Sequence, residues 1–292
     1  MGTQDVHAFT VRPPHVSGSE PNLCDPRDAP WFILGMPHLN GRGLNVGWIL
    51  REAGHQHMFA LGDIPGCQPN GLKDVFGRRA IPGVVSCSIT GRADEFKEDD
   101  VVELVLAQRP SALNGWRSVT QLRATTGAIL TVEVLTVFAS HGGASNHSIE
   151  PATMAPELVA ERGTMVSRRS DQIRWMGSKA RREAEAKLQP RSLSVRISSQ
   201  LHFSGAGIAC YASIHDLFVT AEVNSSPDQD AMQVETRRVH FFGNLDSGDM
   251  LDFSIRSFQR TSEGRDSLVM ISDARRRADG LVVAVCESVY RR

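Results

Sequence analysis

The chain has 292 residues, a formal net charge of −1 and a hydrophobic content of 41%, so it is large enough for two globular domains and lacks the basic excess of a nucleic-acid-binding face. No apolar run reaches the roughly 18–20 residues that span a bilayer, and the start of the chain lacks the pattern of a signal peptide. We therefore expect a cytoplasmic protein with no membrane or nucleic-acid partner. The five cysteines are scattered without a CxxC pair, which indicates reduced thiols and no metal site.

Residues 1–29 are predicted to be an N-terminal extension ahead of a short strand, WFIL, that starts at Trp31. The stretch HLNGRGLN begins at His38, and its two glycines lead into a run whose apolar residues have helical spacing. We therefore predict a helix near residues 43–57. Several β-rich runs separated by turn signals follow, among them VVSCSI, DVVELVLAQ and AILTVEVLTVF, and they complete a first unit over residues 30–149.

Residues 150–192 resemble neither half of the chain and are predicted to be a linker with a helix that Pro190 stops. Between residues 161 and 192 there are nine Lys and Arg against four Asp and Glu. Two interpretations stay open for this segment. It is either a solvated helix that joins two units or a docking face for an acidic partner protein.

The second half, residues 193–292, repeats the first. A glycine-rich turn, HFSGAGIA, begins at His202 and leads into a helix predicted near residues 207–221. Three more features recur in the same order, namely paired arginines (Arg78–Arg79 and Arg237–Arg238), an acidic turn residue (Asp100 and Asp249) and a glycine before the last strand (Gly127 and Gly280). The small changes in spacing are those that loop insertions produce, so we infer a duplication.

In each half one helix is followed by several antiparallel strands, which describes an α+β chain in which a curled sheet wraps a central helix. This is the hot-dog arrangement, and two tandem units make a double hot-dog fold. The segment MPHLNGRGLNVGWILREAG resembles the hot-dog thioesterase signature, in which G-H-x-N precedes an aromatic-containing helix with an acidic residue near its end. Those places are occupied by His38, Asn40, Trp48 and Glu52. The catalytic Asp of that signature, four residues before the His, is Leu34 here, which argues against a simple thioesterase of that type.

A closer resemblance covers roughly residues 30–292. The GMPHL start, the GLNVGWILRE helix, the FSGAG turn and a connecting SN resemble the double-hot-dog proteins of polyketide biosynthesis, represented by the leinamycin-type bifunctional acyltransferase/decarboxylase. The resemblance implies decarboxylation of malonyl- or methylmalonyl-coenzyme A and transfer of the acyl group to an acyl carrier protein. It implies a coenzyme A or phosphopantetheine thioester as substrate and no added cofactor. The family's tyrosine falls near Ile81, and the two tyrosines are Tyr211 and Tyr290, so we do not expect transfer through a tyrosyl ester.

Other functions on acyl thioesters stay open. A dehydratase or isomerase of this fold typically carries H-x-x-x-G-x-x-x-x-P, and no histidine of the chain opens that spacing. A thioesterase for carrier-bound acyl chains and a non-catalytic double hot dog that binds a carrier protein are also compatible with the sequence. The sequence leaves open whether the paired units associate further into a homodimer.

The candidate site residues lie around the two glycine-rich turns, because backbone N–H groups at a helix start can hold a thioester oxygen as it becomes an enolate or oxyanion. We assign catalytic roles to His38, Asn40 and Gly43, since the first turn is the more polar. The expected substrate-binding residues are Gly41, Arg42, Asn146, His202, Ser204, Gly205 and Gly207. The structural alternatives are tight turns for the glycines and capping or packing for the histidines.

Two further segments have a functional and a structural interpretation, and two aspartates have a structural one. The loop at residues 140–151, which contains Asn146, could line a pantetheine channel or simply lead out of the first unit. The run Arg275–Arg277 could meet coenzyme A phosphates or form a solvated hairpin tip. Asp100 and Asp249 stand where a turn enters a strand, and we expect structural roles for both.

Overall fold

The computed structural model describes residues 31–62, 71–108, 116–154, 168–186, 191–225, 232–262 and 265–291, so the predicted extension at residues 1–29 lies outside the described residues. The helices are η2 (Met36–His38), α1 (Val46–Gly62), η3 (Ala93–Glu95), η4 (Asn146–Ser148), α3 (Arg168–Glu185), α4 (Ser199–His202) and α5 (Tyr211–Ser225). The strands are β1 (Trp31–Ile33), β2 (Leu39–Asn40), β3 (Gly43–Leu44), β4 (Ala80–Thr90), β5 (Val101–Gln108), β6 (Trp116–Ala124), β7 (Ile129–His141), β8 (Ile149–Pro151), β9 (Arg191–Arg196), β10 (Gln233–Phe241), β11 (Met250–Ser262), β12 (Arg265–Arg276) and β13 (Val282–Arg291).

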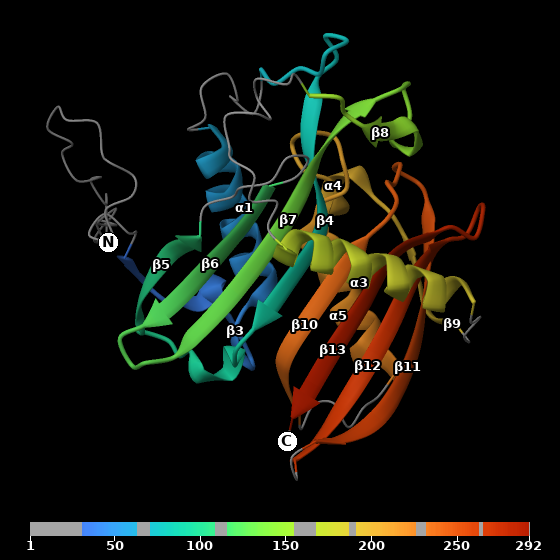
Figure 1. Ribbon diagram of the computed structural model, residues 1–292. Helices are drawn as coiled ribbons and strands as arrows, with labels where there is room; N and C mark the ends of the chain where they lie inside the picture. The colour runs from blue at the N-terminus through green and yellow to red at the C-terminus, as the bar shows by residue number, and fades with distance from the viewer. Residues whose placement is uncertain are drawn as a thin grey trace, which may run out of the picture.

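One large antiparallel sheet runs through the molecule in the order β1-β5-β6-β7-β4-β10-β13-β12-β11-β9, with β8 beside β7 (Figure 1). The two halves of this order mirror each other. At the two edges, a strand before each central helix pairs with the second long strand after that helix, so β1 lies beside β5 and β9 lies beside β11. At the centre, the first long strand after each helix pairs with its counterpart, so β4 lies beside β10. The α+β class is therefore observed, and the layout is consistent with two tandem hot-dog units.

Turn hydrogen bonds recur at equivalent places in the two halves. The amide of Leu34 donates to the carbonyl of Asp100 at 2.9 Å, and the amide of Ile197 donates to the carbonyl of Asp249 at 2.7 Å. Each of these two aspartates also accepts, through its carboxylate, the amide of the residue three positions earlier. The carboxylates therefore fix turns, as the sequence predicts for both.

One element of the predicted duplication is wrong. Arg78 and Arg79 precede β4, whereas Arg237 and Arg238 lie within β10 and face Ile89 and Ser88 of β4. The two arginine pairs are therefore not equivalent. An arginine doublet has no periodicity of its own, so its position relative to a strand cannot be derived from the sequence.

The two central helices begin three to four residues later than predicted, at Val46 and Tyr211. In the first half, Asn40 and Gly43 pair across the short β2–β3 hairpin, which occupies the predicted first turn of the helix. Asn45 then caps α1, because its Oδ1 accepts the amide of Trp48 at 3.2 Å. The glycine-rich turns therefore precede the helices instead of starting them.

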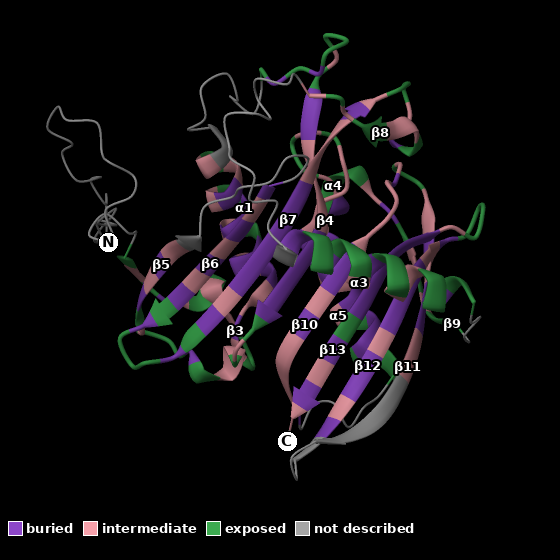
Figure 2. Cartoon of the chain, in the orientation of Figure 1, coloured by how far each residue is buried: buried purple, intermediate pink, exposed green. Residues whose placement is uncertain are grey.

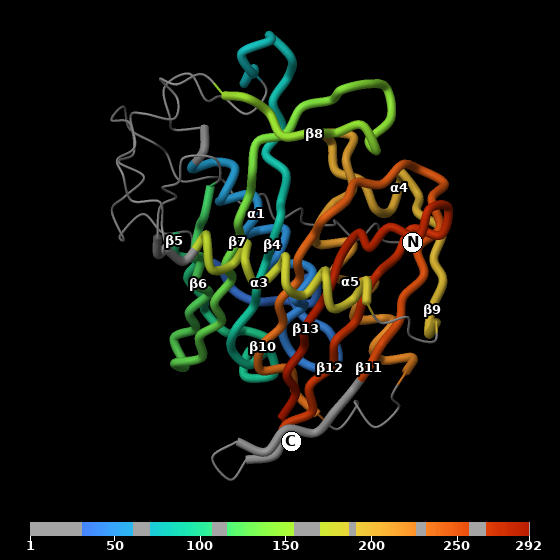
Figure 3. Tube along the Cα trace, turned by 45° about the vertical axis from the view of Figure 1, so that its right-hand side comes forward, coloured from blue at the N-terminus to red at the C-terminus, as the bar shows by residue number. Residues whose placement is uncertain are grey.

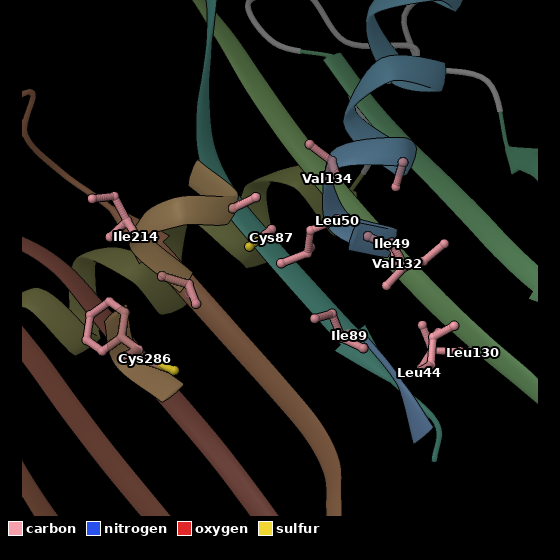
Figure 4. Close-up of a cluster of buried hydrophobic side chains, with 14 of the residues drawn as sticks. Leu44, Ile49, Leu50, Cys87, Ile89, Leu130, Val132, Val134, Ile214 and Cys286 are labelled. Carbon is pink, nitrogen blue, oxygen red and sulfur yellow. The ribbon is translucent and has the colours of Figure 1, made fainter. Parts of the chain in front are cut away.

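A shared hydrophobic core joins the two halves. Figure 4 shows aliphatic side chains of α1, α5 and the central strands meeting between the helices and the sheet. Residues from both halves are fully buried here, including Ile49 and Leu50 of the first and Phe218 and Phe253 of the second. Burial of this apolar surface holds the halves together along their common sheet.

Helix α3 lies on the other face of the sheet. Figure 1 shows it crossing in front of the strands, with α1 and α5 behind them, and Figure 2 shows a solvent-exposed side along it. Its Ala184 packs with Val282 and Val285 of β13. The predicted domain boundaries fall inside β8 and β9, and the predicted linker helix is α3. No helix of the described residues is long and apolar enough to cross a membrane.

Candidate active site

A cavity of about 430 Å³ lies between the two halves of the chain. Its walls come from α1 and β4 of the first half and from α5, β10 and β13 of the second. The interior is largely apolar and includes Ile81, Val84, Ile208, Ile214, Phe241 and Val283. A concave, mostly apolar space with a few polar groups is the usual form of a small-molecule site.

The N-terminus of α5 forms part of the cavity wall through Ala209, Cys210 and Tyr211. The first amides of a helix have no acceptor within the helix, and they carry partial positive charge. On α1 the side chain of Asn45 caps one of these amides. The equivalent position before α5 is Cys210. In the first turn of α5 the amide of Ile214 donates to the carbonyl of Cys210 at 3.1 Å, and the amide of Tyr211 has no acceptor among the described residues. Because Tyr211 lines the cavity, its amide can receive an oxygen there.

Tyr211 fixes α5 against the middle of α1. Its hydroxyl donates to the carbonyl of Leu50 and accepts the amide of Gly54, which are the two groups that an α-helix pairs with each other. A Cβ at position 54 would lie 2.6 Å from this hydroxyl, so only glycine admits the contact. Burial raises the pKa of Tyr211 well above its ordinary value.

Three exposed basic side chains line the cavity. Arg51, His55 and Arg79 line it and are exposed, and none of the residues that line the cavity is acidic. Arg51 is paired with Asp216 of α5 at 3.1 Å. His55 is the imidazole among the described lining residues, and imidazole is the side chain that most often serves as a general base or acid in catalysis.

The predicted first-half site residues lie away from this cavity. The Nδ1 of His38 accepts the amide of Gly35 at 3.0 Å, and its ring packs against Phe32 and Trp48. Asn40 Oδ1 accepts the amide of Arg42 at 2.8 Å, which closes the turn around Gly41. In this structure His38 therefore packs under the turn and Asn40 forms the turn, which are the structural roles that the sequence left open.

Gly43 has a conformational and a packing reason to be glycine. Its φ is +111°, and a Cβ there would lie 2.4 Å from the carbonyl oxygen of Ala93 and 2.8 Å from the Cα of Asp94. The backbone at position 43 therefore approaches another backbone segment. Close approach to a ligand is not needed to explain the residue.

The predicted second-half residues lie at the cavity or next to it. Ser204 lines the cavity, and its Oγ accepts the amide of Ala206 at 3.3 Å in the turn that contains Gly205. His202 is buried, and its Nδ1 accepts the amide of Ser198 at 2.9 Å, as His38 does in its own turn. The two turns therefore contain the same type of histidine hydrogen bond, but only the second turn contributes residues to the cavity wall.

Asn146 connects the first half to the second-half turn. Its Nδ2 donates to the carbonyl of Gly207 at 3.0 Å and to the carbonyl of Leu245, which lines the cavity, at 3.1 Å. Figure 3 shows the loop before β8 beside the segment that leads towards α5. Asn146 is therefore buried against the outside of the cavity wall and holds that wall in place.

His55, Arg79 and Tyr211 line the cavity and are not among the residues predicted from the sequence, whereas His38, Asn40 and Gly43 of the first turn do not line it. A usable signal was the difference between the two helix starts, since a capping Asn45 stands in one half and Cys210 in the other. Ile81, where the family tyrosine was expected, does line the cavity.

The arginines of the run at residues 275–277 are all occupied. Arg275 pairs with Asp273 at 2.8 Å, Arg276 pairs with Asp279 at 2.5 Å and Arg277 pairs with Asp252 at 2.6 Å. Their charges are thus neutralised within the second half, which favours the hairpin interpretation. Within the described residues no group of three or more His, Cys, Asp or Glu is placed to hold a metal ion.

Comparisons with known proteins identify the fold. No protein-family model matches the sequence, and a search of curated proteins finds no relative. A Lactobacillus plantarum protein assigned as an oleoyl thioesterase is 13% identical with a TM-score of 0.61, over 91% of this chain and 98% of that one. The 12:0-ACP thioesterase from Umbellularia californica is 14% identical with a TM-score of 0.59, over 90% and 96%.

An acyl-ACP thioesterase from Bacteroides thetaiotaomicron is 9% identical with a TM-score of 0.53, over 90% of this chain and 97% of that one. At such identities the likeness shows the fold alone, which is the hot-dog fold. All three neighbours match nearly their whole length, and all three are named as thioesterases, not as leinamycin-type enzymes.

Proposed function

We propose that the chain is a double-hot-dog hydrolase of acyl thioesters carried by coenzyme A or by the phosphopantetheine arm of an acyl carrier protein. The observation that carries the proposal is the apolar cavity of about 430 Å³ with the N-terminus of α5 and the exposed imidazole of His55 in its wall. The apolar interior suits an acyl chain, and the amide of Tyr211 suits the oxygen of its thioester. The names of the structural neighbours support hydrolysis over the other reactions of acyl thioesters.

The reaction uses two features of the cavity. The thioester oxygen is held at the N-terminus of α5 by the amide of Tyr211, and His55 accepts a proton from a water molecule whose oxygen bonds to the carbonyl carbon. The negative charge that develops on the carbonyl oxygen is stabilised by this amide and by the positive end of the helix. The C–S bond then breaks, and the imidazolium of His55 returns the proton to the leaving thiolate. The products are a carboxylic acid and a free thiol.

Tyr211 is unsuited to carry the acyl group. Its hydroxyl proton is donated to the carbonyl of Leu50, and burial disfavours the tyrosinate that would act as a nucleophile. Transfer through a tyrosyl ester would also break the contact between α1 and α5. This is the reason to rank hydrolysis above acyl transfer.

Decarboxylation of malonyl- or methylmalonyl-coenzyme A, with transfer to a carrier protein, is the second candidate. It is favoured by one observation, which is that the charged side chains lining the cavity are cationic and none is acidic. An anionic acyl group such as malonyl would meet no like charge there. Transfer would then proceed without a tyrosyl ester.

The test uses the full chain and a series of acyl-coenzyme A thioesters of increasing chain length, with the released thiol measured by its reaction with a chromogenic disulfide. We expect thiol release, and we expect His55→Gln to lower kcat by about 10²-fold or more, as for loss of a general base. Because His55 is exposed, the melting temperature should not change.

His141→Gln is the matched control, since His141 is half-buried at the end of β7 and does not line the cavity. It should leave kcat unchanged. Carbon dioxide release from malonyl-coenzyme A together with a mass gain on a carrier protein would favour the second candidate. Full activity in His55→Gln would remove this histidine from the reaction, and no turnover of any thioester would refute the proposed function.

A further inference from the structure

A short hairpin beside the cavity holds two exposed cations side by side, and one of them, Arg79, lines the cavity. The amide of Ala80 donates to the carbonyl of Leu72 at 2.8 Å, and the amide of Asp74 donates to the carbonyl of Arg78 at 2.9 Å. Between these two bonds, Lys73 and Arg79 face each other as an antiparallel bridge. Directly opposite residues of an antiparallel pair project from the same face, so the two side chains are neighbours.

The hairpin is built rigidly around the buried carboxylate of Asp74. That carboxylate accepts the amides of Phe76 and Arg78 at 3.0 and 2.9 Å, the Nε of Arg78 at 2.8 Å and the hydroxyl of Ser140 at 3.1 Å. Arg78 also pairs with Glu150. The charge of Arg78 is therefore balanced inside the protein, and the turn is fixed to β7.

Lys73 and Arg79 differ from Arg78 in having no ion pair among the described residues. Two like charges placed opposite each other repel, which costs stability unless an anion lies between them. Both side chains are exposed, and Arg79 lines the cavity. The fold thus maintains a pair of cations without an ion-pair partner at the exposed edge of the cavity, where Arg79 lines it.

We propose that Lys73 and Arg79 bind the phosphate at the end of the pantetheine arm of the substrate. The inference rests on the proposed function, because an acyl chain in the apolar interior and a thioester at α5 send the rest of the arm out past the exposed edge of the cavity. That arm ends in a phosphate group in coenzyme A and in a carrier protein alike. Arginine and lysine are the side chains that bind such a group by charge-assisted hydrogen bonds.

Two thioethers that differ only in the phosphate test the site without any turnover. They are S-decyl-4′-phosphopantetheine and S-decyl-pantetheine, whose C–S bonds the enzyme cannot hydrolyse, and their affinities are measured by titration calorimetry on the full chain. We expect the phosphorylated ligand to bind more tightly to the native chain. The double variant Lys73→Gln/Arg79→Gln should weaken that ligand about tenfold and leave the other unchanged.

Arg174→Gln is the matched control for loss of positive charge, because Arg174 is exposed on α3, on the other face of the sheet. It should leave both affinities unchanged. Added salt should weaken only the phosphorylated ligand, and only in chains that retain Lys73 and Arg79. Equal affinities of the two thioethers for the native chain, or an equal loss of both in the double variant, would overturn the proposal.

The two possible sources of the phosphate are separated by activity. Decanoyl-coenzyme A and a decanoylated carrier protein are compared as substrates of the double variant. The substrate whose phosphate binds to Lys73 and Arg79 should show a raised KM with little change in kcat. A chain that prefers the phosphorylated thioether but hydrolyses neither substrate would keep the phosphate site and refute the hydrolase. A chain that hydrolyses both substrates but does not prefer the phosphorylated thioether would support the hydrolase and refute the phosphate site.

Discussion

A single hydroxyl, that of Tyr211, occupies the hydrogen-bonding groups of Leu50 and Gly54 on the opposite helix. Gly54→Ala would normally stabilise a helix by up to about 1 kcal/mol. Here the new Cβ would lie 2.6 Å from the tyrosine hydroxyl, so we expect a loss of stability instead. In a Tyr211→Phe background, where the hydroxyl is gone, the same change should cost much less. Urea unfolding of the four chains measures this coupling, and additive effects would contradict the contact.

Gly43 and Gly207 form a second test at the residue scale. Both have positive φ, +111° and +77°, but only Gly43 has backbone atoms in the path of a Cβ. We expect Gly43→Ala to lower the free energy of unfolding by about 2–4 kcal/mol. Gly207→Ala should cost about 1 kcal/mol, which is the strain of a left-handed residue alone. Thermal melts decide, and equal losses would contradict the close contact with Ala93.

At the scale of the elements, each central helix buries a polar side chain at the same place, eleven residues after the first residue of the helix (57 − 46 and 222 − 211). On α1, His57 contacts the hydroxyls of Ser118 and Thr136 at 2.7 and 3.0 Å. On α5, Glu222 contacts Ser288 at 2.9 Å and Arg237 at 2.5 Å. The same interior place is therefore neutral in one unit and an ion pair in the other.

The buried imidazole makes stability depend on pH. Burial lowers the pKa of His57 to about 4 from an unfolded value of 6.5. Between these values the unfolded chain binds more protons, so the free energy of unfolding falls as pH falls from about 6.5 to 4. From pH 7 to pH 5 His57 should account for about 2 kcal/mol of that fall. Urea titrations of the native chain and of His57→Gln measure it, and equal falls in both would exclude His57 as the cause.

The sequence predicted the central helices and the strand series because apolar periodicity and turn residues are local signals. It placed both helix starts too early, since glycine followed by apolar residues fits a hairpin before a helix as well as a helix start. The pairing of β4 with β10 could not be derived, because it depends on contacts between residues more than a hundred positions apart. For the same reason, the sequence could not show that Arg237 and Arg238 lie within β10, opposite Ile89 and Ser88 of β4.

At the scale of the whole molecule, the shared core predicts that both units unfold together. Glu222→Gln leaves the buried Arg237 without its charged partner and should lower stability by about 3–5 kcal/mol. Trp31 and Trp175 are exposed, whereas Trp116 is buried and Trp48 is half-buried, and these last two are both in the first unit. Their fluorescence midpoint in urea should nevertheless shift with the far-ultraviolet circular dichroism midpoint. A fluorescence midpoint that stayed unchanged would show that the units unfold separately.

The candidate site could be predicted only in part. Of the residues predicted from the sequence, Ser204 in the second glycine-rich turn lines the cavity, and Asn146 donates to Leu245 in its wall. The preference for the first turn used the polarity of each turn alone, and the cavity lies at the second turn. The cavity depends on what faces the turn across the interface, and His55, Gly54 and Arg79 come from the other half of the chain.

The cavity wall is drawn from α1 and β4 on one side and from α5, β10 and β13 on the other, all within one polypeptide. Tethering keeps the two sides at a fixed effective concentration, whatever the amount of protein in solution. Specific activity per chain should therefore stay constant on dilution far below the point at which a site shared by separate subunits would come apart. In a homodimer every substitution would appear in both subunits. In this single chain a substitution in one unit changes only that side of the cavity wall.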